Sequence, residues 1–300
     1  MGSVLEGLPR ASRVAVIRLR SLGDCVLTTP ALAILRRFRP DLRISIVVEP
    51  AWRAVFDGSP DVDEILPPTL TALRRARPDL CLNLHGGSRS AWMTLFSGAR
   101  YRAGFGHFRH QFAYNVRIPS AQEILHVDRT VHTAEHLGSA MFYLGAPVAE
   151  IPRARLTAVE KISSSAIIHP FAATPDKTWR AAGFIEVAQR LQAARIEVVF
   201  IGGRGDSLEP FREFPVLSDA PLSQIKSLLA TASIFIGNDS GPAHMAAAFG
   251  VASVVIFGAS NPTIWGPWRT PAEVITAPGG IAAVTVEQVL GALARLRVAA

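Results

Sequence analysis

The chain has 300 residues, of which 49% are hydrophobic and 18% charged, and its formal net charge is +7. This composition excludes a disordered chain, and the length is more than a typical single domain needs. Two cysteines, Cys25 and Cys81, exclude a disulfide framework, and no apolar run is as long as a membrane-spanning helix. The N-terminus shows no signal-peptide pattern, so we expect a soluble, cytoplasmic protein.

Basic residues are concentrated in the first half of the chain. Residues 1–150 hold 18 arginines against 13 acidic residues, whereas residues 151–300 hold 13 basic and 11 acidic residues. This excess predicts an anionic partner for the first half: nucleic acid, an anionic membrane face or a phosphorylated substrate. A basic surface that only aids solubility is the alternative.

Strand-like and helix-like runs alternate along the first half. Residues 101–130 show no clear pattern, and a helix is predicted at 132–147. The earlier runs are, in chain order, a strand at 13–19, a helix at 25–38, a strand at 43–49, a helix at 51–56, a strand at 64–66, a helix at 69–76, a strand at 80–86 and a helix at 88–97.

The alternation restarts after a polar stretch near 157–165, which we interpret as a linker. Repeated βα units in two blocks predict two α/β domains with parallel sheets, at residues 1–157 and 158–300. The second block comprises a strand at 165–172, a helix at 181–195, a strand at 197–203, a helix at 223–232, a strand at 234–239, a helix at 241–250, strands at 252–259 and 272–277, and a helix at 285–299.

The first turn of interest is Ser21-Leu22-Gly23-Asp24, between the first strand and its helix. Turns that follow parallel strands are where α/β proteins bind ligands. Asp24 could simply cap the helix. Its charged form would be favoured by the helix dipole and by Arg18 and Arg20, and such a carboxylate can accept a proton from an attacking hydroxyl.

A second turn, Gly237 to Gly250, reads GNDSGPAHMAAAFG. The N–H groups of Ser240, Gly241 and Ala243, together with the helix dipole, predict an anion site, and His244 could face the same anion. A well-capped helix with a structural histidine is the alternative.

A third turn, His169 to Trp179, reads HPFAATPDKTW. It contains Lys177, one of only three lysines in the chain. A lysine is a strong point-charge partner for a diphosphate, although an exposed loop lysine without a ligand is the alternative. Trp179 could line a pocket or anchor the loop in the core.

Four segments together resemble glycosyltransferase family 9. They are Ser-Leu-Gly-Asp after the first strand, the His-Pro…Asp-Lys-Thr-Trp loop, Asn-Asp-Ser-Gly-Pro-Ala-His, and FGASNPTIWGP at 257–267. The resemblance implies an α/β GT-B fold, in which two Rossmann-like parallel-sheet domains face one another across a cleft. It also implies inverting, metal-independent transfer of L-glycero-D-manno-heptose from ADP-heptose to the inner core of lipopolysaccharide, with no cofactor and no metal site.

The resemblance also implies residue roles. Asp24 matches the general base, and Lys177 acts with it in catalysis by contacting the donor phosphates. The N-terminal domain would hold the acceptor, an anionic glycolipid (Kdo-lipid A or heptosylated core), and the C-terminal domain the donor. The expected donor contacts are Thr174, Lys177, Asp239, Ser240, Gly241, Pro242 and His244, and the expected acceptor contacts are Ser21, Gly23, Arg20, Arg102 and Arg109.

Two alternatives stay open. Leu222-Ser223-Gln224 stands where relatives often carry an acidic residue that contacts the ribose, so another nucleotide sugar and a different cell-envelope glycan are possible substrates. A non-catalytic, basic nucleic-acid binder is the alternative of another class, although no known RNA-binding pattern is present, and we expect no nucleic-acid partner.

We also expect peripheral contact with the inner face of the cytoplasmic membrane through Arg100, Arg102, Arg109 and Arg117.

Overall fold

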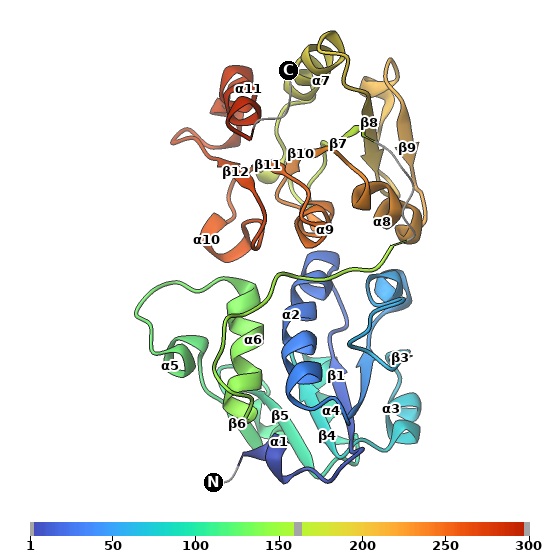
Figure 1. Cartoon of the computed structure of the whole chain (residues 1–300), viewed down its shortest axis with the longest axis vertical. Helices are drawn as coiled ribbons and strands as arrows, with labels where there is room; N and C mark the ends of the chain where they lie inside the picture. Colours follow the sequence, from blue (N-terminus) through green and yellow to red (C-terminus); the bar gives the residue numbers. More distant parts are fainter. Residues whose placement is uncertain (1–2, 159–163, 297–300) are drawn as a thin grey trace. The chain divides into compact units, whose positions relative to one another are not determined.

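The βα alternation produces two parallel sheets of six strands each in the computed structural model, which describes residues 3–158 and 164–296 (Figure 1). The chain divides into two compact units, Met1–Thr157 and Ala158–Ala300. Residues 159–163, in the expected linker, lie outside the described part of the chain, as do the last residues of the helix expected at 285–299.

The first unit is built on a sheet whose central strands are nearly all apolar. The last four residues of β1 and all of β4 are buried, which confirms that the sheet is covered on both faces. The strand order is β3 (Glu64–Leu66), β2 (Arg43–Val47), β1 (Arg13–Ile17), β4 (Leu80–Asn83), β5 (Tyr101–Phe105), β6 (Val116–Ile118).

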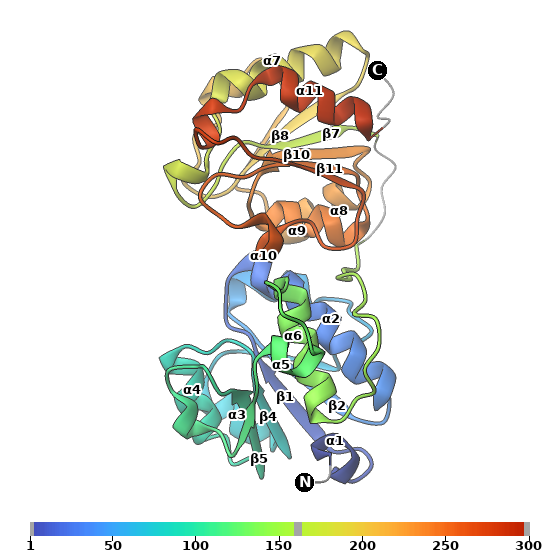
Figure 2. The same ribbon diagram turned by 90° about the vertical axis from the view of Figure 1, so that its left-hand side faces the viewer.

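Helices cover both faces of this first sheet, as Figure 2 shows: α2 and α6 lie on one face, α3 and α4 on the other. Short 3-10 helices at Pro50–Val55 and Gln111–Ala113 complete the unit. The helices are α1 (Val4–Gly7), α2 (Leu22–Phe38), α3 (Leu70–Ala76), α4 (Ser88–Leu95), α5 (Ala121–Leu125) and α6 (Thr133–Leu144).

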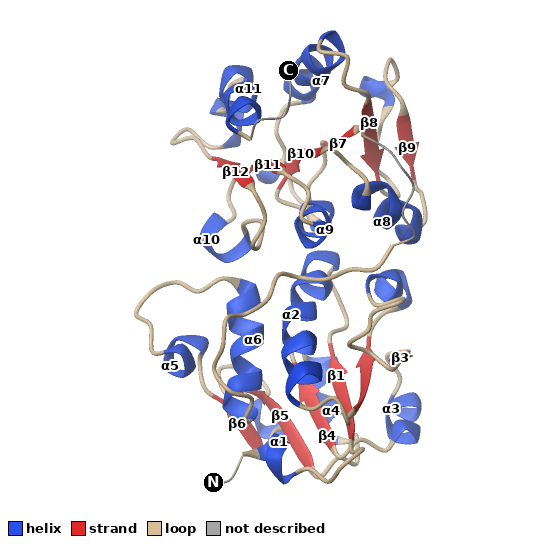
Figure 3. Cartoon of the chain, viewed as in Figure 1, coloured by secondary structure: helices blue, strands red, loops and turns tan. Residues whose placement is uncertain are grey.

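The second unit repeats the architecture, as the strands and helices of Figure 3 show. Its core is formed by apolar side chains from the strands, α7 and α11. The strand order is β12 (Ala272–Ile275), β11 (Ser253–Ile256), β10 (Ile234–Asn238), β7 (Ala166–His169), β8 (Val198–Gly202), β9 (Val216–Ser218). The helices are α7 (Ala181–Ala193), α8 (Leu222–Ala230), α9 (Gly241–Phe249), α10 (Pro262–Trp265) and α11 (Val286–Arg295), with 3-10 helices at Pro175–Lys177, Glu209–Phe211 and Ile281–Ala283.

Residues 101–130, for which the sequence showed no clear pattern, are ordered into secondary structure. This region contains β5, β6 and α5, and β5 pairs with β4 along its first four residues. The strand β6 has only three residues and α5 only five, so neither is long enough to show a hydrophobic period.

Strand register sets which residues share an edge of each sheet. In the first unit Ile17 lies opposite Asn83, so Arg18 and His85 both follow the carboxyl edge. In the second unit Gly237 lies opposite His169, and Asn238 opposite Ile256. The loops after β7, β10 and β11 therefore leave the sheet side by side.

Candidate active site

Asp24 lies in the first turn of α2, which begins at Leu22 rather than at residue 25 as predicted. Its carboxylate accepts hydrogen bonds from the Ser21 hydroxyl (3.0 Å) and the Ser21 N–H (3.4 Å), forming a capping box. The capping interpretation is therefore confirmed. Capping leaves 26% of the side chain exposed, so the same carboxylate remains accessible to a ligand.

Arg18 is the ionic partner of Asp24. Its Nη1 lies 3.2 Å from Asp24 Oδ1, and only 7% of its side chain is exposed. Because a buried guanidinium needs a counter-charge, Arg18 holds the Asp24 carboxylate at the carboxyl edge of the sheet. The pair gives Asp24 one fixed orientation.

Three histidines that the sequence did not single out as site residues lie in this part of the first unit. Burial, followed by the charge of Arg18, lowers the pKa of His85. Burial also lowers the pKa of His136 to about 4, and its ring stacks on Phe105 with 4.0 Å between centroids. His107 lies 5.3 Å from His136, ring to ring, and burial lowers its pKa as well. In each of the three, burial favours the neutral imidazole, which can both donate and accept a hydrogen bond.

The residues expected to contact an acceptor differ in their placement. Gly23 is buried in α2, whereas Ser21, Arg20 and Arg109 are exposed. Arg102 lies in the first half of β5, opposite Cys81, and donates to the carbonyl oxygens of Ala113 (3.2 Å) and Ala99 (3.4 Å). It therefore ties two backbone segments together, and it lies before the strand end that carries ligands in such sheets.

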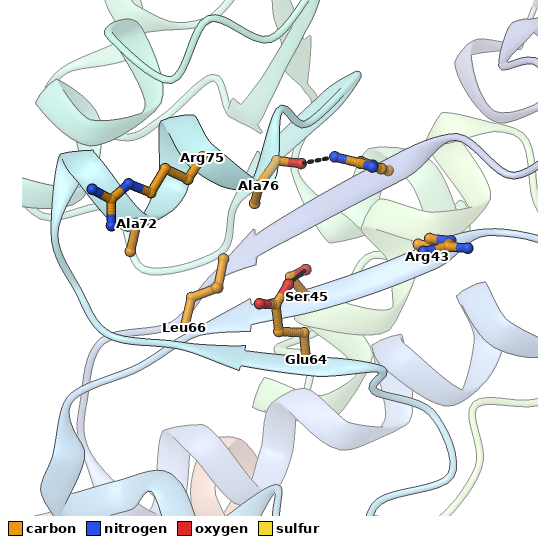
Figure 4. Close-up of a pocket in the computed structure, with 8 residues that line it drawn as sticks. Arg43, Ser45, Glu64, Leu66, Ala72, Arg75 and Ala76 are labelled. Atoms are coloured by element: carbon orange, nitrogen blue, oxygen red, sulfur yellow. Dashed lines mark hydrogen bonds between the residues drawn. The ribbon is translucent and has the colours of Figure 1, made fainter.

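A pocket of about 370 Å³ is lined by residues of β1, β2, β3 and α3 (Figure 4). Its lining includes Arg13, Arg43 and Arg75, with Glu64 and Ser45 between Arg43 and Arg75 in the view. The carboxylate of Glu64 offsets part of this positive charge. Arg13 and Arg43 begin their strands, so they lie at the edge of the sheet opposite to Asp24.

In the second unit, Asn238 ends β10 and joins two loops. Its amide nitrogen donates to the Pro170 carbonyl (2.9 Å), and its amide oxygen accepts from the Trp179 N–H (3.0 Å). Trp179 is only 1% exposed, and its indole N–H donates to the Val284 carbonyl (2.9 Å). Trp179 therefore anchors the 170–180 loop in the core, and it also borders the pocket that runs along residues 172–181.

The turn after β10 forms the start of α9. Ser240 is the N-cap residue and Pro242 lies in the first turn, as predicted. The Ser240 hydroxyl lies 3.1 Å from His169 Nδ1 instead of capping the helix. The Ala243 N–H was expected to be free but donates to the Ser240 carbonyl (3.2 Å), so that prediction was wrong. Within the described chain the backbone N–H groups of Ser240 and Gly241 have no acceptor. Free N–H groups at a helix N-terminus are suited to binding an anion.

Lys177 lies beside this turn. Its Nζ is 3.7 Å from Asp239 Oδ2, with 32% of the Lys177 side chain and 10% of the Asp239 side chain exposed. Gly258, from the loop after β11, lies so close that a Cβ there would be 1.9 Å from the Asp176 carbonyl oxygen. The loop after β7 therefore contacts both the loop after β10 and the loop after β11.

Thr174 and His244 were also expected to contact the nucleotide-sugar donor, and they lie in different surroundings from Lys177. Thr174 donates its hydroxyl to the Asp176 carboxylate and lines an open pocket of about 470 Å³ along residues 172–181. His244 is buried in α9, with its ring 6.4 Å from that of Trp265 in α10. The position of His244 agrees with the alternative of a packed structural histidine.

His169, which sequence reasoning did not select, makes this unit sensitive to acid. Burial lowers the pKa of His169 to about 4, well below its ordinary value of 6.5. The unfolded chain therefore binds a proton at a higher pH than the folded one, so the stability from this residue is complete above about pH 6.5 and is lost as the pH falls toward 4.

We expect His169 to account for about 2 kcal/mol of the loss in unfolding free energy between pH 7 and pH 5. Urea unfolding of the wild type and of His169→Gln at both pH values measures this. Between pH 7 and pH 5 the unfolding free energy of the variant should fall by about 2 kcal/mol less than that of the wild type. An equal loss in both proteins would contradict the assignment.

Among residues 3–158 and 164–296, no three His, Cys, Asp or Glu side chains are arranged to hold a metal ion. No helix within those ranges combines the length and apolar character needed to cross a bilayer.

Comparison with known proteins identifies the family. The chain is 24% identical over 292 residues to lipopolysaccharide heptosyltransferase 3 of Escherichia coli (strain K12), covering 83% of each protein. It superimposes on a glycosyltransferase family 9 structure from Veillonella parvula with a TM-score of 0.83 and 22% identity, covering 96% of this chain and 97% of that one. For the E. coli ADP-heptose lipopolysaccharide heptosyltransferase II structure the TM-score is 0.79 at 21% identity, with 95% and 98% covered.

These structural similarities confirm the predicted α/β GT-B fold class of two Rossmann-like domains. The family model of glycosyltransferase family 9 (heptosyltransferase) matches residues 69–288, which include β4, the Lys177 loop and the α9 turn. This match covers well over half of the chain. The chain therefore belongs to glycosyltransferase family 9, the heptosyltransferase family, and is an enzyme of that family.

Proposed function

We propose that this enzyme transfers L-glycero-D-manno-heptose from ADP-heptose to the inner core of lipopolysaccharide, with inversion at the anomeric carbon. The observation that carries the proposal is the family match over residues 69–288 together with the contact between Lys177 and the α9 turn. The named relatives support the substrates, since one is a lipopolysaccharide heptosyltransferase and another an ADP-heptose heptosyltransferase.

In the proposed reaction the acceptor hydroxyl attacks the anomeric carbon of the donor. Asp24 takes the hydroxyl proton as the bond to the sugar forms, and the bond from the sugar to the ADP oxygen breaks. A single displacement of this kind inverts the anomeric configuration. Arg18 keeps the Asp24 carboxylate oriented through its 3.2 Å contact.

The departing ADP gains negative charge, which the second unit would stabilise. Lys177 supplies a positive charge, and the N–H groups of Ser240 and Gly241 at the α9 N-terminus supply two donors. Thr174 would contact the donor phosphates from the neighbouring loop. Because these groups provide the positive potential, the proposed reaction needs no divalent metal.

For the acceptor we propose Ser21, Arg20 and Arg109, which are exposed in the first unit. Gly23 would contribute through the turn that places Asp24. We leave out Arg102, whose guanidinium is bound to backbone carbonyl groups.

The test is a transfer assay with ADP-heptose and two acceptors, Kdo-lipid A and a heptosylated core, in the presence of EDTA. We expect one acceptor to gain one heptose, and the anomeric configuration of the product to be inverted relative to the donor. Matched reactions with UDP- and GDP-linked sugars are the control. Transfer from one of these sugars in place of ADP-heptose would overturn the donor assignment, and loss of activity in EDTA would overturn metal independence.

A further inference from the structure

Three large aromatic side chains of the first unit lie exposed, and one of them, Trp92, contacts the other two. Trp92, Phe96 and Phe112, which we call the aromatic patch, are 50%, 52% and 54% exposed. The rings of Trp92 and Phe96 are stacked at 5.8 Å with an interplanar angle of 10°, and Phe112 meets Trp92 edge-on at 5.6 Å. Large apolar side chains gathered at a surface commonly mark an interaction site.

The aromatic patch is held by buried structure. Trp92 lies on α4, whereas Phe112 lies in the 3-10 helix Gln111–Ala113. Asn83, at the end of β4, donates from its amide nitrogen to the Ser90 hydroxyl (3.1 Å) and to the Tyr114 hydroxyl (3.0 Å). The two segments that carry Trp92 and Phe112 are thereby tied to the same strand of the sheet.

The stretch of sequence that carries the aromatic patch contains basic residues but no acidic ones. Residues 80–122 contain five arginines and no aspartate or glutamate. Arg89 is paired with Glu49 at 2.5 Å, and Arg100 lies over the Tyr101 ring at 5.1 Å. Arg109 and Arg117 are exposed on either side of Phe112 in the sequence. A ligand of this surface is therefore apolar in one part and anionic in another.

We infer that the aromatic patch docks on the surface of a lipid bilayer that contains anionic headgroups, with the three rings at the headgroup level and Arg109 and Arg117 against the lipid phosphates. Aromatic rings favour this interfacial layer, and anionic leaflets attract basic segments. The inference depends on these side chains and does not require the proposed transfer reaction. The aromatic patch would hold the enzyme at the bilayer surface, where a lipid-anchored acceptor lies.

Other partners fit the aromatic patch less well. Three half-exposed aromatic side chains offer roughly 300–400 Å², well below the area that a stable dimer buries on each subunit. Single-stranded nucleic acid binds by stacking bases on open ring faces. One face of Trp92 is already stacked on Phe96, so less of its ring is available to a base.

The experiment is sedimentation of the full chain with vesicles of phosphatidylcholine, with and without phosphatidylglycerol. We expect binding to the mixed vesicles at low ionic strength, weakened by salt. The double variant Trp92→Ser/Phe112→Ser should bind roughly tenfold more weakly or worse. The matched control is Tyr143→Ser/Val148→Ser, which removes two exposed apolar side chains elsewhere in the same unit and should bind like the wild type.

Brominated lipids in the mixed vesicles report on Trp92 directly. They should quench part of the wild-type tryptophan fluorescence, and Trp92→Phe should keep its binding while losing that quenching. The inference is overturned if the wild type ignores the mixed vesicles, if the patch variant binds like the wild type, or if a single-stranded oligonucleotide is bound in preference to vesicles. Because vesicle binding is measured without substrate, a failed transfer assay leaves this test intact.

Discussion

Replacing Asp24 with asparagine is expected to lower kcat by about 10² to 10⁴-fold, the range for loss of a general base. Asparagine has the same shape and can still accept a hydrogen bond from Ser21, but it cannot take the proton of the acceptor hydroxyl. Steady-state kinetics with saturating ADP-heptose and acceptor measure the effect. Turnover within a few-fold of the wild type would rule out Asp24 as the base.

The control for Asp24→Asn has to separate catalysis from stability. Losing the charge of Asp24 leaves Arg18 buried without its counter-ion, which also lowers the unfolding free energy, by up to about 3 kcal/mol. Asp41→Asn breaks another arginine pair of the same unit, in which Asp41 Oδ1 lies 2.7 Å from Arg39 Nε. We expect Asp41→Asn to leave kcat unchanged, and we expect Asp24→Asn to retain ADP binding because the second unit is unaltered.

Replacing Lys177 with alanine is expected to weaken ADP binding at least tenfold and to lower kcat by about 10²-fold. A hydrogen bond to a charged group contributes about 1.5–3 kcal/mol, and charge stabilisation of a leaving group contributes more in the transition state than in the ground state. Calorimetry with ADP and the transfer assay measure the two effects. An ADP affinity equal to that of the wild type would exclude Lys177 from the donor site.

Two variants sharpen the test of Lys177. Lys177→Arg keeps the charge in a planar, wider group, so it should restore ADP affinity better than it restores kcat. Arg212→Ala breaks an exposed ion pair of the same unit, in which Nη1 lies 2.5 Å from the Glu209 carboxylate. It should change neither quantity, because both side chains of that pair are mostly exposed.

The sequence predicted most of the fold because its strands are long apolar runs. β1, β4, β7 and β10 were located within a few residues, and their parallel order followed from the alternation with helices. The elements that escaped prediction, such as β6 and β9, have three residues each. β6 and β9 acquire their conformation from pairing with a neighbouring strand, which local sequence does not reveal, although the equally short β3 was predicted.

The candidate site was predictable in its loops but less so in its contacts. Lys177 and Asp239 were both expected at the carboxyl edge of the second sheet, yet their ion pair joins residues 62 positions apart and depends on side-chain packing. His85 could have been found, since it lies near the end of the strand predicted at 80–86 and follows the observed β4 closely. The role of Arg102 as a backbone tie could not have been, because Arg102 and its partner Ala113 both belong to the region with no readable pattern.

Asn238 joins the Pro170 carbonyl to the Trp179 N–H, and Gly258 lies against the Asp176 carbonyl oxygen with no room for a side chain. The loops proposed to hold the diphosphate are thus held in position by the fold itself. A nucleotide that binds here would fix few additional backbone torsions and would lose little conformational entropy. Nucleotide recognition by this enzyme should therefore resemble binding to a preorganised receptor, with a small heat-capacity change, rather than folding coupled to binding.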